Sequence, residues 1–89
     1  MAYAVYVLRN PDGRYYIGQT ADLALRLRRH NQGMVFWTKG RGPWEVVYSQ
    51  QFETRSTAMA EERRLKGLKS RKALEKLVAQ SVESRQRRD

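Results

Sequence analysis

The sequence predicts a small α+β domain in which three short strands and three helices share one core. Two runs rich in aromatic and β-branched residues, 3–8 and 14–18, flank an Asn-Pro-Asp-Gly turn at 10–13. Proline fixes φ and Asp-Gly tolerates a chain reversal, so the two runs are expected to form a hairpin. A third strand is predicted over 44–52. The chain has 89 residues, the size of a single domain.

The first helix is expected to follow the hairpin. Thr20 can serve as its N-cap, with Asp22 favourable in the first turn. The helical pattern runs to about Gln32, and Gly33 suits a left-handed C-terminal stop. Leu23 and Leu27 would then face the core.

Two further helices are predicted after the third strand. Ser56 can cap the second, which Gly67 weakens or ends, and Ser70 can cap the third. The third has an apolar face made of Leu74, Leu77 and Val78. From about Gln80 the chain offers almost nothing to bury, so we expect a domain over 1–79 and a basic, flexible tail over 80–89.

The composition narrows the function classes. Eighteen Lys and Arg against nine Asp and Glu give a formal net charge of +9, which favours polyanionic partners. Nucleic acid is the first partner to consider, ahead of an acidic protein or an anionic membrane surface. There is no cysteine and one histidine, which excludes disulfides and makes a His-rich zinc site implausible. No run approaches a membrane span or a signal peptide, so a soluble, cytoplasmic protein is expected.

Two side chains of the first helix are candidates for chemistry. At 100° per residue, Arg26 and His30 lie at the edge of the apolar stripe, one turn apart, whereas Arg28 faces the opposite way. From that edge Arg26 can reach across the adjoining sheet to a substrate phosphate. The alternative is a solvated cation, and the spacing of Arg26 behind Tyr16-Ile17-Gly18 favours the functional interpretation.

Glu62 is the most anomalous residue of the second helix. It falls within an apolar face of Ala58, Met59 and Leu65, while Glu61 lies nearer the border. A buried carboxylate is costly unless it is paired or binds a metal. One interpretation is an i, i+4 ion pair with Lys66. The favoured interpretation is a ligand for a hard divalent cation such as Mg²⁺.

The tyrosines of the hairpin have two interpretations as well. Strand alternation places Tyr16 and Gly18 on one face of the sheet. In the first strand, the side chain of Tyr6 points to the opposite face from those of Val5 and Val7. Tyr6 and Tyr16 are then either packing residues or two hydroxyls that converge beside a glycine. A phenol titrates near ~10, so it could act as a base only if nearby cations lower its pKa.

The segment 34–43 is predicted to be a basic loop. It contains Thr38, Lys39 and Arg41 and leads into Trp44. Such a loop could contact a nucleic-acid backbone, because cations bind phosphates and aromatic rings stack on bases. It could equally be a surface loop. We expect Lys39 and Arg41 to point outward and Trp44 to enter the core.

The ordered motifs resemble those of the GIY-YIG nuclease family, and the match extends from about Tyr3 to Lys72. The chain carries Ala4-Val5-Tyr6 where the family has Gly-Ile-Tyr, then Tyr16-Ile17-Gly18, and Arg26 on the following helix. The segment 58–66 is similar to the family's metal-binding helix. The resemblance implies one three-stranded, mostly antiparallel sheet flanked by about three helices.

The resemblance also implies a site and an activity. The matching site residues are Tyr6, Tyr16, Arg26, His30 and Glu62, with Glu62 as the metal ligand. They imply hydrolysis by an activated water with one Mg²⁺ or Mn²⁺ bound. Arg26 would steady charge on the phosphate, and Tyr16 would serve as the base with Tyr6 assisting.

The leading hypothesis is a metal-dependent endonuclease that acts on DNA in preference to RNA, in repair or recombination. Its expected nucleic-acid contacts are Arg14, Lys39, Arg41 and Lys66. The chain shows no targeting module, so a protein partner could supply targeting. The alternatives are a nucleic-acid-binding module with little catalysis and a small RNA- or ribosome-associated protein.

Overall fold

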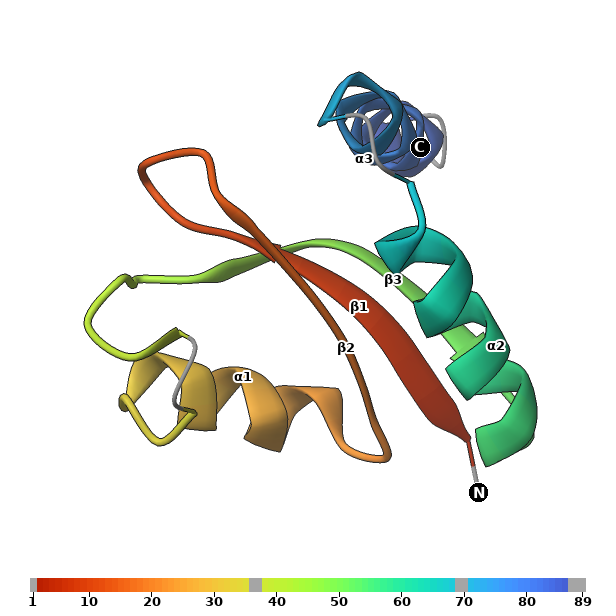
Figure 1. Ribbon diagram of the computed structural model, residues 1–89, viewed down its shortest axis with the longest axis horizontal. Helices are drawn as coiled ribbons and strands as arrows, with labels where there is room; N and C mark the ends of the chain where they lie inside the picture. The colour runs from red at the N-terminus through yellow and green to blue at the C-terminus, as the bar shows by residue number, and fades with distance from the viewer. Residues whose placement is uncertain (1, 36–37, 69–70, 87–89) are drawn as a thin grey trace.

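The three strands form one antiparallel sheet, as predicted. The computed structural model describes residues 2–35, 38–68 and 71–86. Strand β1 (Tyr3–Arg9) lies at the centre of the sheet, between β2 (Tyr15–Thr20) and β3 (Glu45–Phe52), and both neighbours run antiparallel to it (Figure 1). The central strand is buried over Ala4 to Leu8 because it has a neighbour on each side and helices on both faces.

The predicted hairpin joins β1 to β2. Gly13 adopts a φ of 81°, the left-handed conformation that the reversal requires. Asn10 is buried and organises the turn, because its side-chain oxygen accepts a 2.8 Å hydrogen bond from the backbone N–H of Arg14. The resulting register places Tyr6 opposite Gly18.

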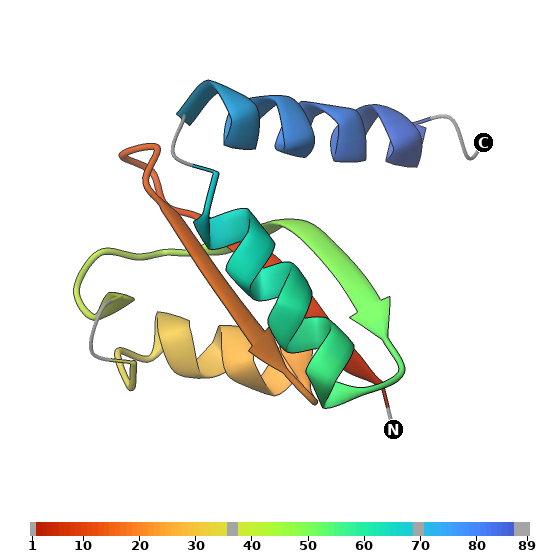
Figure 2. The ribbon, with the colours of Figure 1, turned by 45° about the vertical axis from the view of Figure 1, so that its right-hand side comes forward.

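Helices cover both faces of the sheet. Helix α1 (Leu23–Asn31) lies on one face, and α2 (Arg55–Lys66) with α3 (Arg71–Gln86) lies on the other (Figures 1 and 2). On the α1 face, Leu23 and Leu27 pack against Tyr6, Leu8 and Trp44. The expected core orientation of these two leucines is confirmed.

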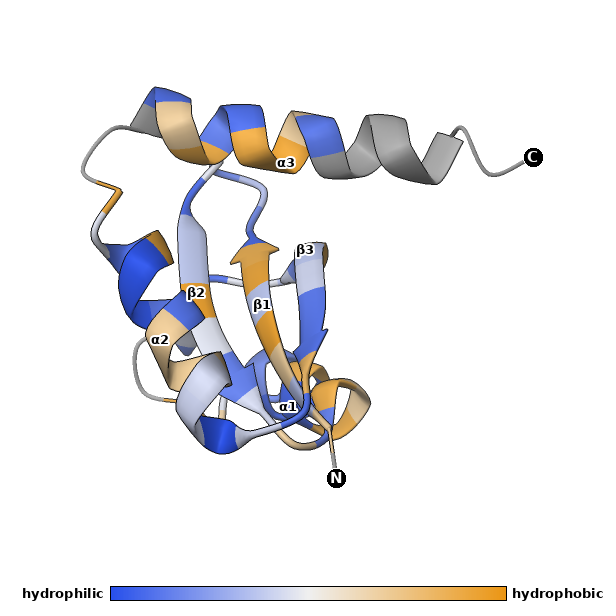
Figure 3. Ribbon diagram, turned by 90° about the vertical axis from the view of Figure 1, so that its right-hand side faces the viewer, coloured by the Kyte–Doolittle hydropathy of each residue, from blue (hydrophilic) through white to orange (hydrophobic). Residues whose placement is uncertain are grey.

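The opposite face holds the larger apolar cluster. Its buried residues come from β1, β3, α2 and α3: Val5, Val7, Tyr48, Ala58, Leu65 and Leu74. The hydropathy colouring shows an apolar central strand and places the apolar residues of α3 toward the sheet (Figure 3). Leu74 and Val78 are buried and Leu77 packs against the cluster, so the predicted apolar face of the third helix is confirmed.

The helix starts differ from the predictions. Asp22, rather than Thr20, caps α1: it has extended backbone, and its carboxylate accepts a hydrogen bond from the N–H of Leu25. Thr20 remains in β2. Thr54, rather than Ser56, caps α2 by accepting from the N–H of Thr57. In both cases the cap is the residue directly before the first helical one, whereas Thr20 lies in β2 and Ser56 lies inside α2.

The predicted helix ends agree more closely with the structure. Helix α1 stops at Asn31, and Gly33 adopts the expected left-handed φ of 75°. Gly67 follows the last residue of α2. Helix α3 continues to Gln86, past the point near Gln80 where the sequence predicted a tail. The predicted cap Ser70 lies outside the described residues.

Met59 corrects the predicted apolar face of α2. Ala58 and Leu65 are buried, but Met59 is 41% exposed. The helix therefore meets the sheet along a narrower stripe than the sequence predicted, and Glu62 lies beside that stripe rather than inside an apolar core. Within the residues described, no helix is long and apolar enough to cross a membrane.

Gly18 gives a direct test of this packing. A Cβ at Gly18 would lie 2.6 Å from the Tyr6 hydroxyl oxygen and 2.7 Å from its Cζ, so Gly18→Ala should displace a buried ring. We expect a loss of about 1–3 kcal/mol in the free energy of unfolding, measured by chemical denaturation. Gly67→Ala is the matched control, because there the nearest atoms are 3.4 Å away and the φ is −80°. Equal stability of the two variants would contradict this packing.

Candidate active site

Four of the five predicted catalytic residues lie together on the α1 face of the sheet. Tyr6 comes from the central strand, Tyr16 from β2, and Arg26 and His30 from α1. The ring centroids of Tyr6 and Tyr16 are 6.4 Å apart, and those of Tyr16 and His30 are 4.7 Å apart. Gly18 makes this cluster possible, because the Tyr6 ring occupies the space where a side chain at that position would be. The two tyrosine rings therefore lie near each other on one face of the sheet, as strand alternation predicted.

Hydrogen bonds connect the cluster. The Tyr6 hydroxyl lies 3.0 Å from His30 Nε2, and His30 Nδ1 lies 2.7 Å from the Thr38 hydroxyl. Arg26 donates from Nε to the Tyr6 oxygen across 3.4 Å. His30 is 1% exposed, so the edge position expected from the helical pattern becomes a fully buried one once the loop carrying Thr38 covers it.

Burial sets the charge state of the cluster. Burial lowers the pKa of His30 to about 4, and the nearby Arg26 adds to that shift. Burial also raises the pKa of Tyr6, outweighing the opposite effect of the Arg26 hydrogen bond. The resting state at neutral pH is therefore an uncharged imidazole beside a protonated Tyr6. A tyrosine could act as a base only if nearby cations lowered its pKa, and the pKa of Tyr6 is raised instead.

Arg26 is the cation of this cluster. Its hydrogen bond to the Tyr6 hydroxyl raises the pKa of Arg26, and Tyr16 adds to that effect. Its side chain is half-buried, whereas Arg28 is exposed, as the helical pattern predicted. A guanidinium held in this way keeps donors available for a phosphate oxygen.

Glu62 lies on α2, across the sheet from α1. Its negative charge is the smallest of the contributions that raise the pKa of Tyr6, after burial and Tyr16. Its Oε2 atom forms a 2.8 Å ion pair with Lys66, so the i, i+4 pair considered from the sequence does form. Glu62 and Lys66, with Met59 and Arg63, line a cavity of about 230 Å³.

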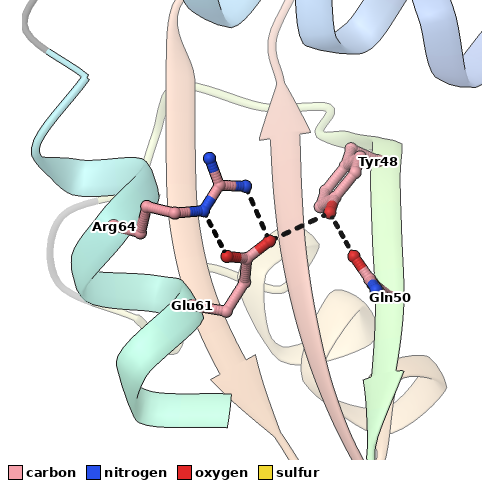
Figure 4. A network of polar contacts seen from close by, with 4 residues as sticks. All are labelled: Tyr48, Gln50, Glu61 and Arg64. Carbon is pink, nitrogen blue, oxygen red and sulfur yellow. Dashed lines mark hydrogen bonds and ion pairs between the residues drawn. The ribbon is translucent and has the colours of Figure 1, made fainter. Parts of the chain in front are cut away.

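The neighbouring Glu61 is held elsewhere. Its carboxylate receives a two-pronged interaction from Arg64, at 2.6 and 2.9 Å, and lies 3.4 Å from the Tyr48 hydroxyl (Figure 4). Tyr48 in turn donates to Gln50 on the same strand across 2.7 Å. The hydrogen bonds from Arg64 lower the pKa of Glu61. Glu61 thus joins α2 to Tyr48 of β3.

The donor set fits one kind of metal binding. Across residues 2–35, 38–68 and 71–86, no three His, Cys, Asp or Glu side chains cluster as a metal site. Mg²⁺, however, is commonly bound through one or two carboxylates together with substrate phosphates and waters. A single carboxylate, Glu62, beside a cavity fits that mode. Lys66 would have to release Glu62.

The loop before β3 is held in place by side chains that the sequence did not identify. Asn31 accepts a 2.6 Å hydrogen bond from the Trp44 N–H and donates to the Trp44 carbonyl. The Trp44 ring, 5% exposed, donates from Nε1 to the Thr38 carbonyl. Lys39 and Arg41 are exposed. Trp44 therefore points inward and the two cations point outward, as expected.

The remaining predicted nucleic-acid contacts are dispersed. Arg14 is exposed beside the hairpin turn, and Lys66 is exposed on α2. Lys39 also lines a second open cavity, of about 520 Å³, whose other lining residues include His30 and Asn31. The structure thus places Lys39 at the edge of a cavity that His30 also lines.

Thr38 and Asn31 have no distinctive sequence signal. Thr38 is 1% exposed although it lies in a loop of glycines and cations, where threonine is ordinarily a surface residue. Asn31 is the last residue of α1, and asparagine is common at helix ends even where it has no long-range hydrogen bond. Both roles come from a loop that folds back over the helix.

Comparison with known proteins agrees with this geometry. The family model described as the GIY-YIG catalytic domain matches residues 2–76. A UPF0213 protein of Oceanobacillus iheyensis is 46% identical over 65 residues, which cover 72% of this chain and 76% of that protein. A UPF0213 protein of Halobacterium salinarum is 40% identical over 65 residues, covering 72% and 84% of the two chains.

A solved structure shows the same fold. The solution NMR structure of a UPF0213 protein from Bacillus halodurans superposes with a TM-score of 0.58 at 38% sequence identity, covering 89% of this chain and 84% of that one. Together with the match over residues 2–76, it shows that this chain belongs to the GIY-YIG catalytic domain family.

Proposed function

We propose that this protein is a divalent-metal-dependent endonuclease that hydrolyses phosphodiester bonds in DNA. The family points to nuclease chemistry on nucleic acid. The observation that carries the proposal is the convergence of Tyr6, Tyr16, Arg26 and His30 on one face of the sheet, with the charge of Glu62 within range. A structural core alone would not need a half-buried guanidinium aimed at a tyrosine oxygen.

Each residue has a distinct role in this mechanism. Arg26 donates to a non-bridging phosphate oxygen and stabilises the charge that develops there, which is the main contribution such sites make. Tyr16, less buried than Tyr6, would accept the proton of the attacking water in its deprotonated, phenolate form. Tyr6, fixed by His30 and Arg26, assists by orienting that water. These roles depend on positioning more than on covalent chemistry.

Glu62 would hold the metal ion. When bound, Mg²⁺ or Mn²⁺ supplies Lewis-acid stabilisation of the phosphate and helps to generate the nucleophile. Lys66 would then exchange its ion pair with Glu62 for a contact with the nucleic-acid backbone, which keeps its charge paired.

We also propose a substrate and a biological setting for this activity. Arg14, Lys39 and Arg41 are exposed cations that would contact phosphates, and phosphate contacts position a duplex without reading its sequence. A protein partner would therefore direct the domain to its substrate, in repair or recombination. Cleavage of plasmid DNA compared with a structured RNA of equal concentration tests the preference for DNA.

The role of Glu62 can be tested against its neighbour. Glu62→Gln should reduce Mg²⁺- or Mn²⁺-dependent nicking of a supercoiled plasmid by about 10²-fold or more, because it removes the only charge proposed to bind the metal. Glu61→Gln is the matched control. It removes one carboxylate from the same helix but only weakens the contacts to Arg64 and Tyr48, so nicking should stay near the wild-type rate. An equal loss of nicking in both variants would contradict the role of Glu62 as the metal ligand.

Arg26 and Arg28 form a second matched pair. Both substitutions to alanine remove one positive charge from α1, so plasmid affinity and its salt dependence should change alike. Only Arg26→Ala should lower the nicking rate of the bound complex, by about 10²–10³-fold. If the two variants nick equally fast at saturating protein, Arg26 contributes binding alone. Absence of nicking by the wild type, with salt-sensitive binding intact, would instead favour a binding module.

A further inference from the structure

Thr38 is a buried hydroxyl directed at the catalytic cluster from outside it. Its side chain is 1% exposed, and its oxygen lies 2.7 Å from His30 Nδ1 and 3.3 Å from the carbonyl of Val35. The other ring nitrogen, Nε2, lies 3.0 Å from the Tyr6 hydroxyl. The tautomer of His30 therefore determines which way every proton in this chain of contacts points.

Counting donors separates the two tautomers. If His30 carries its proton on Nδ1, it donates to Thr38, and Thr38 donates to the Val35 carbonyl. Nε2 then accepts from the Tyr6 hydroxyl, whose oxygen accepts from Arg26. All four contacts are satisfied by four available protons.

The opposite tautomer satisfies only three of these contacts. With the proton on Nε2, His30 donates to Tyr6 and Thr38 must donate to Nδ1. The contact from Thr38 to the Val35 carbonyl is then lost. The Tyr6 hydroxyl proton also loses its acceptor, although Tyr6 is 1% exposed. A buried donor without a partner is costly.

We propose that Thr38 is a positioning residue that holds His30 in the Nδ1–H tautomer, so that Nε2 accepts the proton of Tyr6. The consequence for Tyr6 rests on the proposed nuclease function. With its hydrogen turned toward His30, Tyr6 presents lone pairs to the reacting centre and receives a hydrogen bond from the attacking water. The opposite tautomer would turn Tyr6 into a donor to the phosphate.

The surroundings of His30 keep the ring neutral, as this role requires. Tyr6 from β1, Tyr16 from β2 and Arg26 from its own helix lie around it, with Thr38 from the loop. Of these groups, Arg26 brings a positive charge, which opposes protonation of the ring. The lowered pKa of His30 is consistent with that arrangement.

Nitrogen NMR tests the tautomer directly, because the chain contains a single histidine. With ¹⁵N-histidine labelling at pH 7, the wild type should show Nδ1 in the protonated, pyrrole-like range and Nε2 in the unprotonated, pyridine-like range. Thr38→Val keeps the side-chain shape without the hydroxyl, and should shift the ring toward the Nε2–H form. Thr38→Ser keeps the hydroxyl and should restore the wild-type pattern.

The outcomes are decisive in either direction. A wild-type ring protonated on Nε2, or a Thr38→Val ring unchanged from wild type, would overturn the proposal. The measurement needs no substrate, so it stands even if the protein cuts nothing, and the wild-type spectrum suffices if Thr38→Val does not fold.

In the nicking assay, Thr38→Val should lose at least about tenfold in rate while Thr38→Ser retains it, since a misplaced imidazole proton is costly in catalysis. Equal nicking rates for Thr38→Val and the wild type would show that the tautomer of His30 plays no part in the mechanism.

Discussion

The packing of Tyr6 over Gly18 is the contact on which the rest of the site depends. Because the two residues face each other across β1 and β2, the absence of a side chain at Gly18 leaves the space that the end of the Tyr6 ring occupies. The hydroxyl then reaches His30 on α1, and His30 reaches Thr38 in the loop before β3. One close approach thus connects the sheet, a helix and a loop.

The same contact explains why the electrostatics of the site are unusual for so basic a chain. The net charge is +9, yet the centre of the cluster is uncharged apart from Arg26, because burial keeps Tyr6 and His30 neutral. The positive field therefore attracts a polyanion while the interior supplies directional hydrogen bonds. Two adjacent glutamates of α2 have different partners: Glu61 contacts Tyr48 of β3, and Glu62 pairs with Lys66.

Much of this architecture follows from local sequence rules. Strand alternation predicts that Tyr6, Tyr16 and Gly18 share a face, and the helical period predicts the directions of Arg26 and Arg28. Local rules did not identify Thr38 or Asn31, since both act through contacts between segments separated in the chain. They also gave Met59 an inward position, because the period of a helix does not tell how wide a stripe the sheet covers. They chose the wrong cap for two helices, because several polar residues near each start have a similar capping preference.

The central claim is that Glu62 and the tyrosine cluster form one metal-assisted site. Paramagnetic broadening by Mn²⁺ tests it most directly, measured on the His30 ring signals with a non-cleavable phosphorothioate DNA duplex bound. We expect strong broadening of these signals in the wild type and in Glu61→Gln, and loss of that broadening in Glu62→Gln. Broadening that persists in Glu62→Gln, or that spares His30 in the wild type, would contradict it.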